Sequence, residues 1–143
     1  YNLIYDDSKF IKFIESIKDD NLKIKSRPTY PIEYRKYPKG SKGMQWHQDT
    51  SLFYPDAFEV VLTITNTSSS KFLWKENDGT IKSVNPQANT LAIVKPISVL
   101  HSVSSVLDGE RTILKFVVEF IEKDKETNEL KSTFKSEFEK CPF

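Results

Sequence analysis

The stretch MQWHQDT, residues 44–50, decides how this chain is interpreted, because it places His47 and Asp49 two positions apart. Residues i and i+2 of an extended strand point to the same face. The two side chains can therefore offer one nitrogen and one oxygen to a single ion. The chain has one other histidine, His101, which follows a β-rich interval. We predict that His47, Asp49 and His101 hold a metal and that the rest of the chain is the scaffold that brings them together.

The combination of ligands points to a particular kind of metal site. Two histidines and one carboxylate, with the other coordination positions open, form the facial triad that binds non-heme Fe(II). Imidazole and carboxylate suit this ion better than thiolate does. A single histidine on a strand is more often a surface or core residue, so the prediction depends on all three ligands and their spacing.

Length and composition indicate one globular domain covering residues 1–143. The 143 residues are 38% hydrophobic and 13% aromatic, which is enough for a sizeable core. The 21 basic and 20 acidic residues leave a net charge of +1. Such a balance creates no overall field that would attract nucleic acid or an anionic membrane. Composition does not decide whether the surface has a local basic groove, or what the oligomeric state is.

Cysteine content and hydropathy suggest a cytoplasmic location. Cys141 is the only cysteine, so an intrachain disulfide is excluded and a reducing compartment is expected. No apolar run reaches the roughly 18 to 20 residues of a membrane span, and the N-terminus lacks a signal-peptide pattern. The sequence begins at Tyr1 rather than a methionine, so removal of an address signal stays open.

The N-terminal part is predicted to form a helix over residues 6–20. Asp6, Asp7 and Ser8 provide N-cap chemistry. The apolar residues that follow recur at helical spacing: Phe10, Ile11, Phe13, Ile14 and Ile17. One apolar face should pack on the outside of a sheet, and a partner-binding helix is the alternative.

The middle of the chain, residues 31–121, is predicted to be a β-rich core. Short β-prone runs cover residues 32–37, 44–47, 58–66, 71–74, 80–84, 90–95, 100–103 and 111–121. Turn residues separate them at 38–43, 67–70, 77–79, 85–87 and 108–109. About eight strands without intervening helices favour a sandwich or barrel over a parallel sheet.

The C-terminal segment, residues 122–143, is rich in Lys and Glu. Leu130, Phe134 and Phe138 follow at i, i+4 and i+8, which predicts a short amphipathic helix packed on the core. A disordered tail is the alternative.

These residues together resemble a known family. The run YPKGSKGMQWHQD (residues 37–49), followed by His101 and then by Gly109-Glu110-Arg111, is similar to the 2-oxoglutarate and Fe(II)-dependent dioxygenases, most of all to their prolyl-hydroxylase-like branch. The resemblance covers roughly residues 31–121. It implies a mostly β protein with a double-stranded β-helix, also called a jelly roll or cupin-like fold, and with the N-terminal helix packed outside it.

The resemblance also implies an activity. Its iron ligands would be His47, Asp49 and His101, and 2-oxoglutarate and O2 would be consumed to hydroxylate a C–H bond, with release of succinate and CO2 and with ascorbate as a reductant. The presence of Asp49 argues against a halogenase, which lacks that carboxylate. A peptidyl prolyl or another protein side chain is the expected substrate. A small molecule or a nucleobase is the alternative, and so is a cupin-like module that holds Zn or Ni without turnover.

Three residues would contact the cosubstrate. Arg111 would pair with the C5 carboxylate of 2-oxoglutarate, in place of the lysine that collagen-type prolyl hydroxylases carry. Tyr37 would line the same pocket, although it could instead be a core aromatic residue. Thr63 would be a second partner of the carboxylate, but a one-residue change of register would replace it with Ile64.

Substrate contacts are expected around the mouth of the iron site. Arg35 and Trp46 could line the cleft, and Trp46 could equally be a packing residue. Loops often carry function, so the loop 50–57 with Phe53 and Tyr54 is predicted to contact the substrate together with the turn at residues 40–43.

Overall fold

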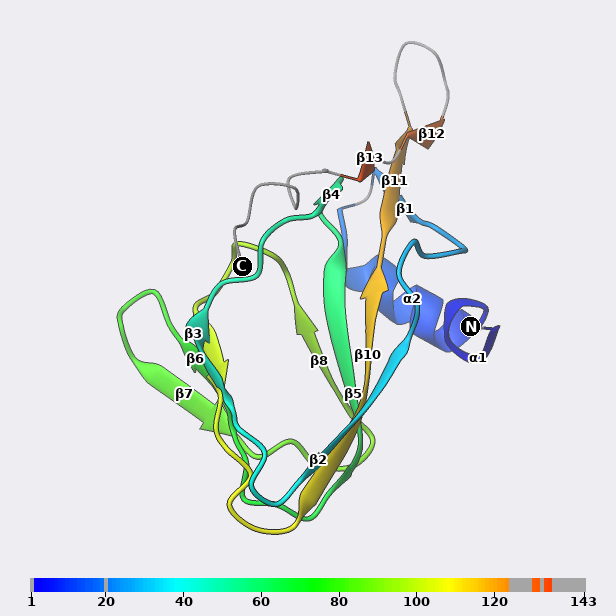
Figure 1. The fold of residues 1–143 in the computed structure, drawn as a ribbon. Helices are drawn as coiled ribbons and strands as arrows, with labels where there is room; N and C mark the ends of the chain where they lie inside the picture. Colours follow the sequence, from blue (N-terminus) through cyan, green and yellow to red (C-terminus); the bar gives the residue numbers. More distant parts are fainter. Residues whose placement is uncertain (1, 20, 124–129, 132, 135–143) are drawn as a thin grey trace. The chain divides into compact units, whose positions relative to one another are not determined.

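The structure, a computed structural model, describes residues 2–19, 21–123, 130–131 and 133–134. The chain divides into two compact units (Figure 1). The first unit comprises Tyr1–Pro31, Ser51–Phe58 and Val117–Phe143, and the second comprises Ile32–Thr50 and Glu59–Phe116. All three predicted metal ligands belong to the second unit.

The second unit contains two four-stranded sheets. One has the order β2 (Glu33–Pro38), β10 (Glu110–Val118), β5 (Phe58–Asn66) and β8 (Thr90–Val94). The other has the order β3 (Met44–His47), β9 (His101–Val103), β6 (Phe72–Lys75) and β7 (Ile81–Val84). Along the chain the strands alternate between the sheets, with β6 and β7 as a hairpin inside one of them. This antiparallel arrangement is the predicted double-stranded β-helix.

The predicted long strand over 111–121 is in fact two strands. β10 pairs with β2 as far as Lys115, opposite Glu33, whereas β11 (Phe120–Lys123) pairs with β1 (Leu22–Ile24). Glu119 lies at the break and is 2% exposed. Its carboxylate accepts hydrogen bonds from Lys25 and Thr29, which occupy the point where the pairing partner changes.

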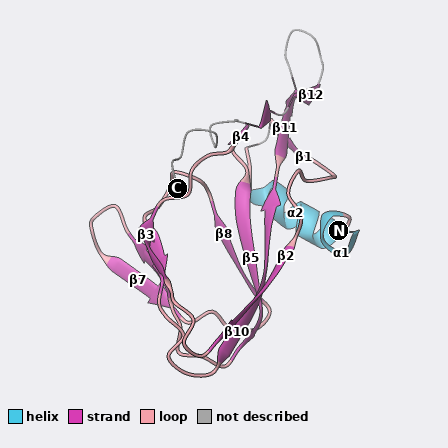
Figure 2. Ribbon diagram, in the orientation of Figure 1, coloured by secondary structure: helices cyan, strands magenta, loops and turns pink. Residues whose placement is uncertain are grey.

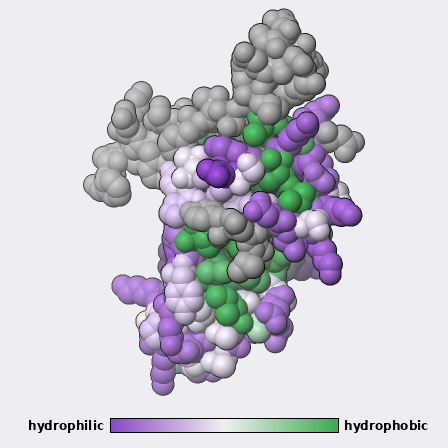
Figure 3. All heavy atoms as spheres, turned by 90° about the vertical axis from the view of Figure 1, so that its right-hand side faces the viewer, coloured by the Kyte–Doolittle hydropathy of each residue, from purple (hydrophilic) through white to green (hydrophobic). Residues whose placement is uncertain are grey.

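The helical part of the first unit is shorter than predicted. It consists of α1 (Asn2–Tyr5) and α2 (Ser8–Ile17), with Asp7 as the N-cap accepting from the Phe10 amide at 2.7 Å. Ile14 is fully buried, whereas Phe13 and Ile17 stay about half exposed. Figure 2 shows the two helices in cyan, and Figure 3 shows hydrophobic and hydrophilic side chains side by side on one face of the molecule. The predicted packing of the N-terminal helix against the outside of the β-helix stays a prediction.

The C-terminal helix expected over 122–143 is wrong where the structure describes this segment. Leu130–Lys131 forms β12, paired with β11, and Thr133–Phe134 forms β13, paired with β4 (Phe53–Tyr54). An interval of four residues keeps side chains on one face of a strand as well as of a helix. The spacing was therefore compatible with a helix and with a strand. Pairing with β11 and β4 made these residues strands. Phe138 lies outside the described residues. No helix in the described part of the chain is long and apolar enough to cross a membrane.

Candidate metal centre and cofactor pocket

Two adjacent strands bring the histidines together. His47 ends β3 and His101 begins β9, and the two residues are partners in the antiparallel ladder. Their ring centroids are 4.3 Å apart. The ladder is irregular between Met44 and His47, which is a β-bulge. His101 is only 6% exposed, whereas the His47 side chain is 29% exposed, so the pair extends from the interior toward the surface.

Asp49 completes the cluster from the segment after β3. Its Oδ1 lies 3.6 Å from Nε2 of His47, and its Oδ2 lies 3.5 Å from Nε2 of His101. Two ligands that each lie about 2.1 Å from an ion are about 3 Å apart at right angles and about 3.4 Å apart in a tetrahedron. Oδ2 is buried and has no hydrogen-bond partner. The three residues therefore fit a shared cation.

The histidine tautomers support this conclusion. Nδ1 of His47 lies 2.7 Å from the Gln45 carbonyl, and Nδ1 of His101 lies 3.1 Å from the Val99 carbonyl. A carbonyl oxygen only accepts, so Nδ1–H donates in both rings, which leaves Nε2 as the atom that can carry a lone pair for a metal. Both lone pairs then face the Asp49 carboxylate, and a cation between them would relieve the repulsion. Backbone carbonyls commonly orient metal-binding histidines in this way.

Close packing holds the two strands at this separation. A Cβ on Gly43 would lie 2.0 Å from the Val103 carbonyl oxygen, so only glycine fits at the position just before β3. On the other side of the site, the Phe72 ring packs on His101 with centroids 5.5 Å apart. Composition alone did not mark Phe72 as a site residue.

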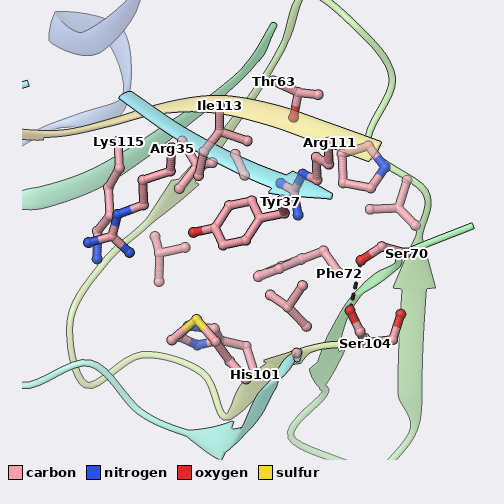
Figure 4. A pocket seen from close by; sticks show the side chains of 18 of the residues that line it. Arg35, Tyr37, Thr63, Ser70, Phe72, His101, Ser104, Arg111, Ile113 and Lys115 are labelled. Atoms are coloured by element: carbon pink, nitrogen blue, oxygen red, sulfur yellow. Dashed lines mark hydrogen bonds between the residues drawn. The ribbon is translucent and has the colours of Figure 1, made fainter. Parts of the chain in front are cut away.

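A cavity of about 280 Å³ opens between the sheets and includes all three ligands. This volume is near the lower end of the roughly 300–1,000 Å³ that is typical of small-molecule sites. The cavity also includes every residue predicted to bind the cosubstrate, namely Arg111, Tyr37 and Thr63, as well as Arg35 (Figure 4). Metal ligands and predicted cosubstrate residues therefore share one pocket.

Arg111 is a buried cation. It is 6% exposed, and its Nε has no hydrogen-bond partner. Among the described residues, no carboxylate lies within ion-pairing distance of it. Burial lowers the pKa of the guanidinium, and the neighbouring Tyr37 partly opposes this effect. A buried charge is normally paired, so Arg111 is suited to bind an anionic ligand.

The structure decides the register at Thr63. Glu59, Val61 and Thr63 are alternate residues of β5, and all three line the cavity. Thr63 is 1% exposed. Ile64 is not among the lining residues, so the threonine and not the isoleucine is available to a ligand.

The predicted substrate residues are placed differently from one another. Arg35 lines the cavity, and its contacts with the Tyr37 side chain and with Glu33 raise the pKa of its guanidinium despite partial burial. Trp46 is 40% exposed and is not among the lining residues. Phe53 and Tyr54 belong to the first unit, where Phe53 is buried and Tyr54 donates to Glu122. Their contact with substrate stays a prediction.

Sequence reasoning missed an ion pair in the cavity. Lys115 Nζ lies 2.9 Å from Glu59 Oε2, and both residues line the pocket. A signal was present, because Lys115 lies four positions after Arg111 and alternate residues of a strand share a face. The turn predicted to contact substrate contributes Lys42 and Gly43 to the lining.

Comparison with known proteins supports the fold. No model of a protein family matches the sequence, and no curated protein sequence matches it. Among solved structures, a 2OG-Fe(II) oxygenase family oxidoreductase from Burkholderia pseudomallei is similar, with a TM-score of 0.63 and 19% identity over 82% of this chain and 55% of that one. The non-heme monooxygenase ThoJ, solved as a nickel complex, gives a TM-score of 0.61 and 12% identity over 94% of this chain and 55% of its own.

A prolyl-4-hydroxylase from Pseudomonas putida gives a TM-score of 0.50 and 22% identity over 61% of this chain and 49% of that one. The chain thus spans about half the length of these solved proteins. At such low identity the likeness establishes the fold, which is the double-stranded β-helix found in these oxygenases. Fold and site define the class of this protein as a double-stranded β-helix with a His-Asp-His cluster whose ligand atoms could hold a metal ion.

Proposed function

We propose that the protein is an Fe(II)- and 2-oxoglutarate-dependent dioxygenase that hydroxylates a C–H bond. One molecule each of 2-oxoglutarate, O2 and R–H would give succinate, CO2 and R–OH. One observation carries the proposal: the buried guanidinium of Arg111, whose Nε has no hydrogen-bond partner and which no described carboxylate pairs with, lines the same cavity as His47, Asp49 and His101. A metal-binding module without turnover would share the three ligands but would have no use for this cation.

The metal ligands would hold Fe(II) and leave coordination positions open for exchangeable ligands. When bound, Fe(II) supplies the activation of O2 that this chemistry requires. The protein's own contribution at this point is orientation. The Gln45 and Val99 carbonyls hold both imidazoles with Nε2 toward Asp49, which is the orientation that a shared metal requires.

At the other end of the cosubstrate, Arg111 would bind the C5 carboxylate. A guanidinium forms a planar, bidentate, charge-assisted pair with a carboxylate. Its burial excludes competing water, which strengthens the pair. The buried hydroxyl of Thr63 and the hydroxyl of Tyr37 would add neutral hydrogen bonds of about 1 kcal/mol each.

The expected substrate is a peptidyl prolyl or another protein side chain. This expectation derives from the resemblance to the prolyl-hydroxylase-like branch, because fold alone does not specify a substrate. The alternative is a small molecule or a nucleobase, and the near-neutral net charge disfavours the nucleobase. The charged side chains Arg35, Glu59 and Lys115 in the cavity favour the small molecule.

The proposal can be tested without knowing the substrate. Metal-free protein would be mixed anaerobically with Fe(II) and 2-oxoglutarate and examined for the weak visible charge-transfer band of a chelated keto acid. The band should form with the unaltered protein and be lost in His47→Ala and in Arg111→Ala. Arg111→Ala should still bind the metal. Lys82→Ala, which removes an exposed cation from β7, is the matched control and should retain the band.

Two results would contradict the proposal. If metal binds but no band forms, the protein would be the non-catalytic cupin-like module. If Arg111→Ala keeps undiminished affinity for 2-oxoglutarate, the cosubstrate is not held by this arginine.

A further inference from the structure

The cavity has cationic groups at two separate places along β10. Arg111, Ile113 and Lys115 are alternate residues of this strand, and all three line the cavity. At a rise of about 3.3 Å per residue, Arg111 and Lys115 are about 13 Å apart along the strand. Four C–C bonds of about 1.5 Å limit the five-carbon chain of 2-oxoglutarate to about 6 Å. A cosubstrate anchored at Arg111 therefore leaves the Lys115 end to another ligand.

Three charged side chains form this second end, and we call them the charged cluster: Arg35, Glu59 and Lys115. Figure 4 shows Arg35 and Lys115 on one side of the Tyr37 ring and Arg111 on the other. Arg35 on β2 lies opposite Ile113 on β10, and Ile113 precedes Lys115 by two residues on the same strand. Lys115 and Glu59 form an ion pair at 2.9 Å across neighbouring strands. The cluster thus presents both signs of charge to one cavity.

The charged cluster differs from Arg111 in exposure. The side chains of Lys115 and Glu59 are each 27% exposed and that of Arg35 is 41% exposed, whereas Arg111 is 6% exposed. A ligand could therefore reach the cluster from solvent. An ion pair this accessible contributes only about 0–1 kcal/mol to stability, so its members can be altered without unfolding the protein.

Each member retains hydrogen-bonding capacity. A guanidinium has five N–H donors, of which Glu33 engages those on Nε and Nη2 of Arg35 and the Tyr37 side chain engages a further one. The remaining donors can take a carboxylate. A carboxylate has about four acceptor sites, and the described contacts of Glu59 use one of them, for Lys115. The rest can take an ammonium group. Between these charges the lining is apolar, with Ile113, Val61 and Ala92.

We infer that the charged cluster binds a small substrate that carries both a carboxylate and an ammonium group, as a free amino acid does. Arg35 with Lys115 would bind the carboxylate, Glu59 would bind the ammonium group, and the apolar lining would contact a short aliphatic portion. A residue inside a peptide has neither charge, so it would make no use of this arrangement. The inference rests on the proposed dioxygenase function and selects its small-molecule form.

The test starts from the anaerobic complex with Fe(II) and 2-oxoglutarate. Each of the common free L-amino acids would be added, with the change in the visible band and calorimetric binding as readouts. At least one should perturb the band and bind. Its N-acetyl derivative, its amide, and a tripeptide with the same residue in the middle should each bind about tenfold more weakly or worse.

Variants assign the effect to the cluster. Glu59→Gln should weaken binding of the amino acid and leave the affinity for its amide low. Arg35→Gln should weaken binding of the amino acid by about tenfold or more. Glu110→Gln is the matched control, because Glu110 also pairs with a lysine, Lys36, at 2.9 Å but lies outside the cavity lining. It should bind the amino acid as the unaltered protein does.

The outcomes distinguish failure of the amino-acid site from failure of the proposed dioxygenase function. A normal band with no amino acid bound, or with blocked derivatives and the tripeptide bound equally well, would overturn the inference and leave the dioxygenase assignment intact. Failure of the band itself would overturn the proposed function. In that case calorimetry on the metal-loaded protein without 2-oxoglutarate still tests the cluster, because absence of amino-acid binding would refute it.

Discussion

His47 stands directly opposite His101 in the β3–β9 ladder, although Met44 is already opposite Val103. Three steps on β3 therefore match two on β9, and the bulge supplies the extra residue. In a regular ladder, Trp46 would be the partner of His101. A bulge redirects the side chains that follow it, and here it brings an imidazole to the metal site in place of an indole.

This arrangement predicts how metal binding depends on single residues. Loss of an outer partner of a metal ligand typically costs about 10- to 100-fold in affinity, so loss of a ligand itself should exceed about 100-fold. His47→Ala and His101→Ala should show this loss by calorimetry with Mn²⁺. Metal at 100 times Kd should also raise the free energy of unfolding of the unaltered protein by about 2.7 kcal/mol, and its melting temperature with it. Trp46→Ala should behave like the unaltered protein, and loss of metal in that variant would contradict the bulge argument.

Gly43→Ala should disturb the same ladder. The added methyl would lie 2.0 Å from a backbone oxygen on β9, which cannot move aside as a side chain could. We expect at least about 3 kcal/mol of lost stability in urea, together with weaker metal binding. Gly40→Ala in the same turn is the control. Its φ of +89° makes a side chain unfavourable by about 1–2 kcal/mol, but no atom lies within 4 Å of the new Cβ. Equal effects of the two substitutions would refute the close-approach argument.

Arg111→Met should stabilise the ligand-free protein while abolishing 2-oxoglutarate binding. The guanidinium is buried without an anion, so an apolar side chain of similar length removes a desolvation cost of roughly 1–4 kcal/mol. Urea unfolding without ligand would measure the gain. Arg35→Met should give no gain, because Arg35 already has Glu33 and Tyr37 as partners. A less stable Arg111→Met protein would indicate a structural role for the arginine.

Asp108, which lies just before β10, should make the free energy of unfolding depend on pH. The hydroxyl and amide of Ser69 donate to its carboxylate at 2.6 and 2.9 Å, and they lower its pKa below the ordinary value. The folded state then favours the ionised form, so this contribution is present above the unfolded pKa and is lost as the pH falls below about 4. Asp108→Asn should be less stable than the unaltered protein at pH 7, and the difference should shrink toward pH 2. Ser69→Ala should follow the same trend, and a pH-independent difference would count against it.

Much of the second unit could be predicted because its signals are local. The turn residues and the alternation of β-prone residues placed strands at 44–47 and 58–66, which are the bounds of β3 and β5. The His47, Asp49 and His101 set followed from residue chemistry and spacing. The strands and the His47–Asp49 pair depend on neighbours a few positions apart, and His101 is the one other histidine in the chain, so the linear sequence displays all of them directly.

Pairing across the chain could not be predicted in the same way. Leu130 and Phe134 had a spacing that suits a helix or a strand, and only the partners β11 and β4 decided for strands. Likewise, Thr63 and Ile64 could not be distinguished until the β5 register put Thr63 into the cavity.

By itself, then, the amino-acid sequence determined which chemical groups this protein has for a metal and an anion, and that they lie in a β-rich core. The tertiary structure alone decided that Arg111 is buried with no hydrogen-bond partner for its Nε and that Lys115 meets Glu59 in the same cavity. The physical reason is that burial and ion pairing arise from strands distant in the chain. Their register is set by many backbone hydrogen bonds and packing contacts together, which no short stretch of sequence specifies.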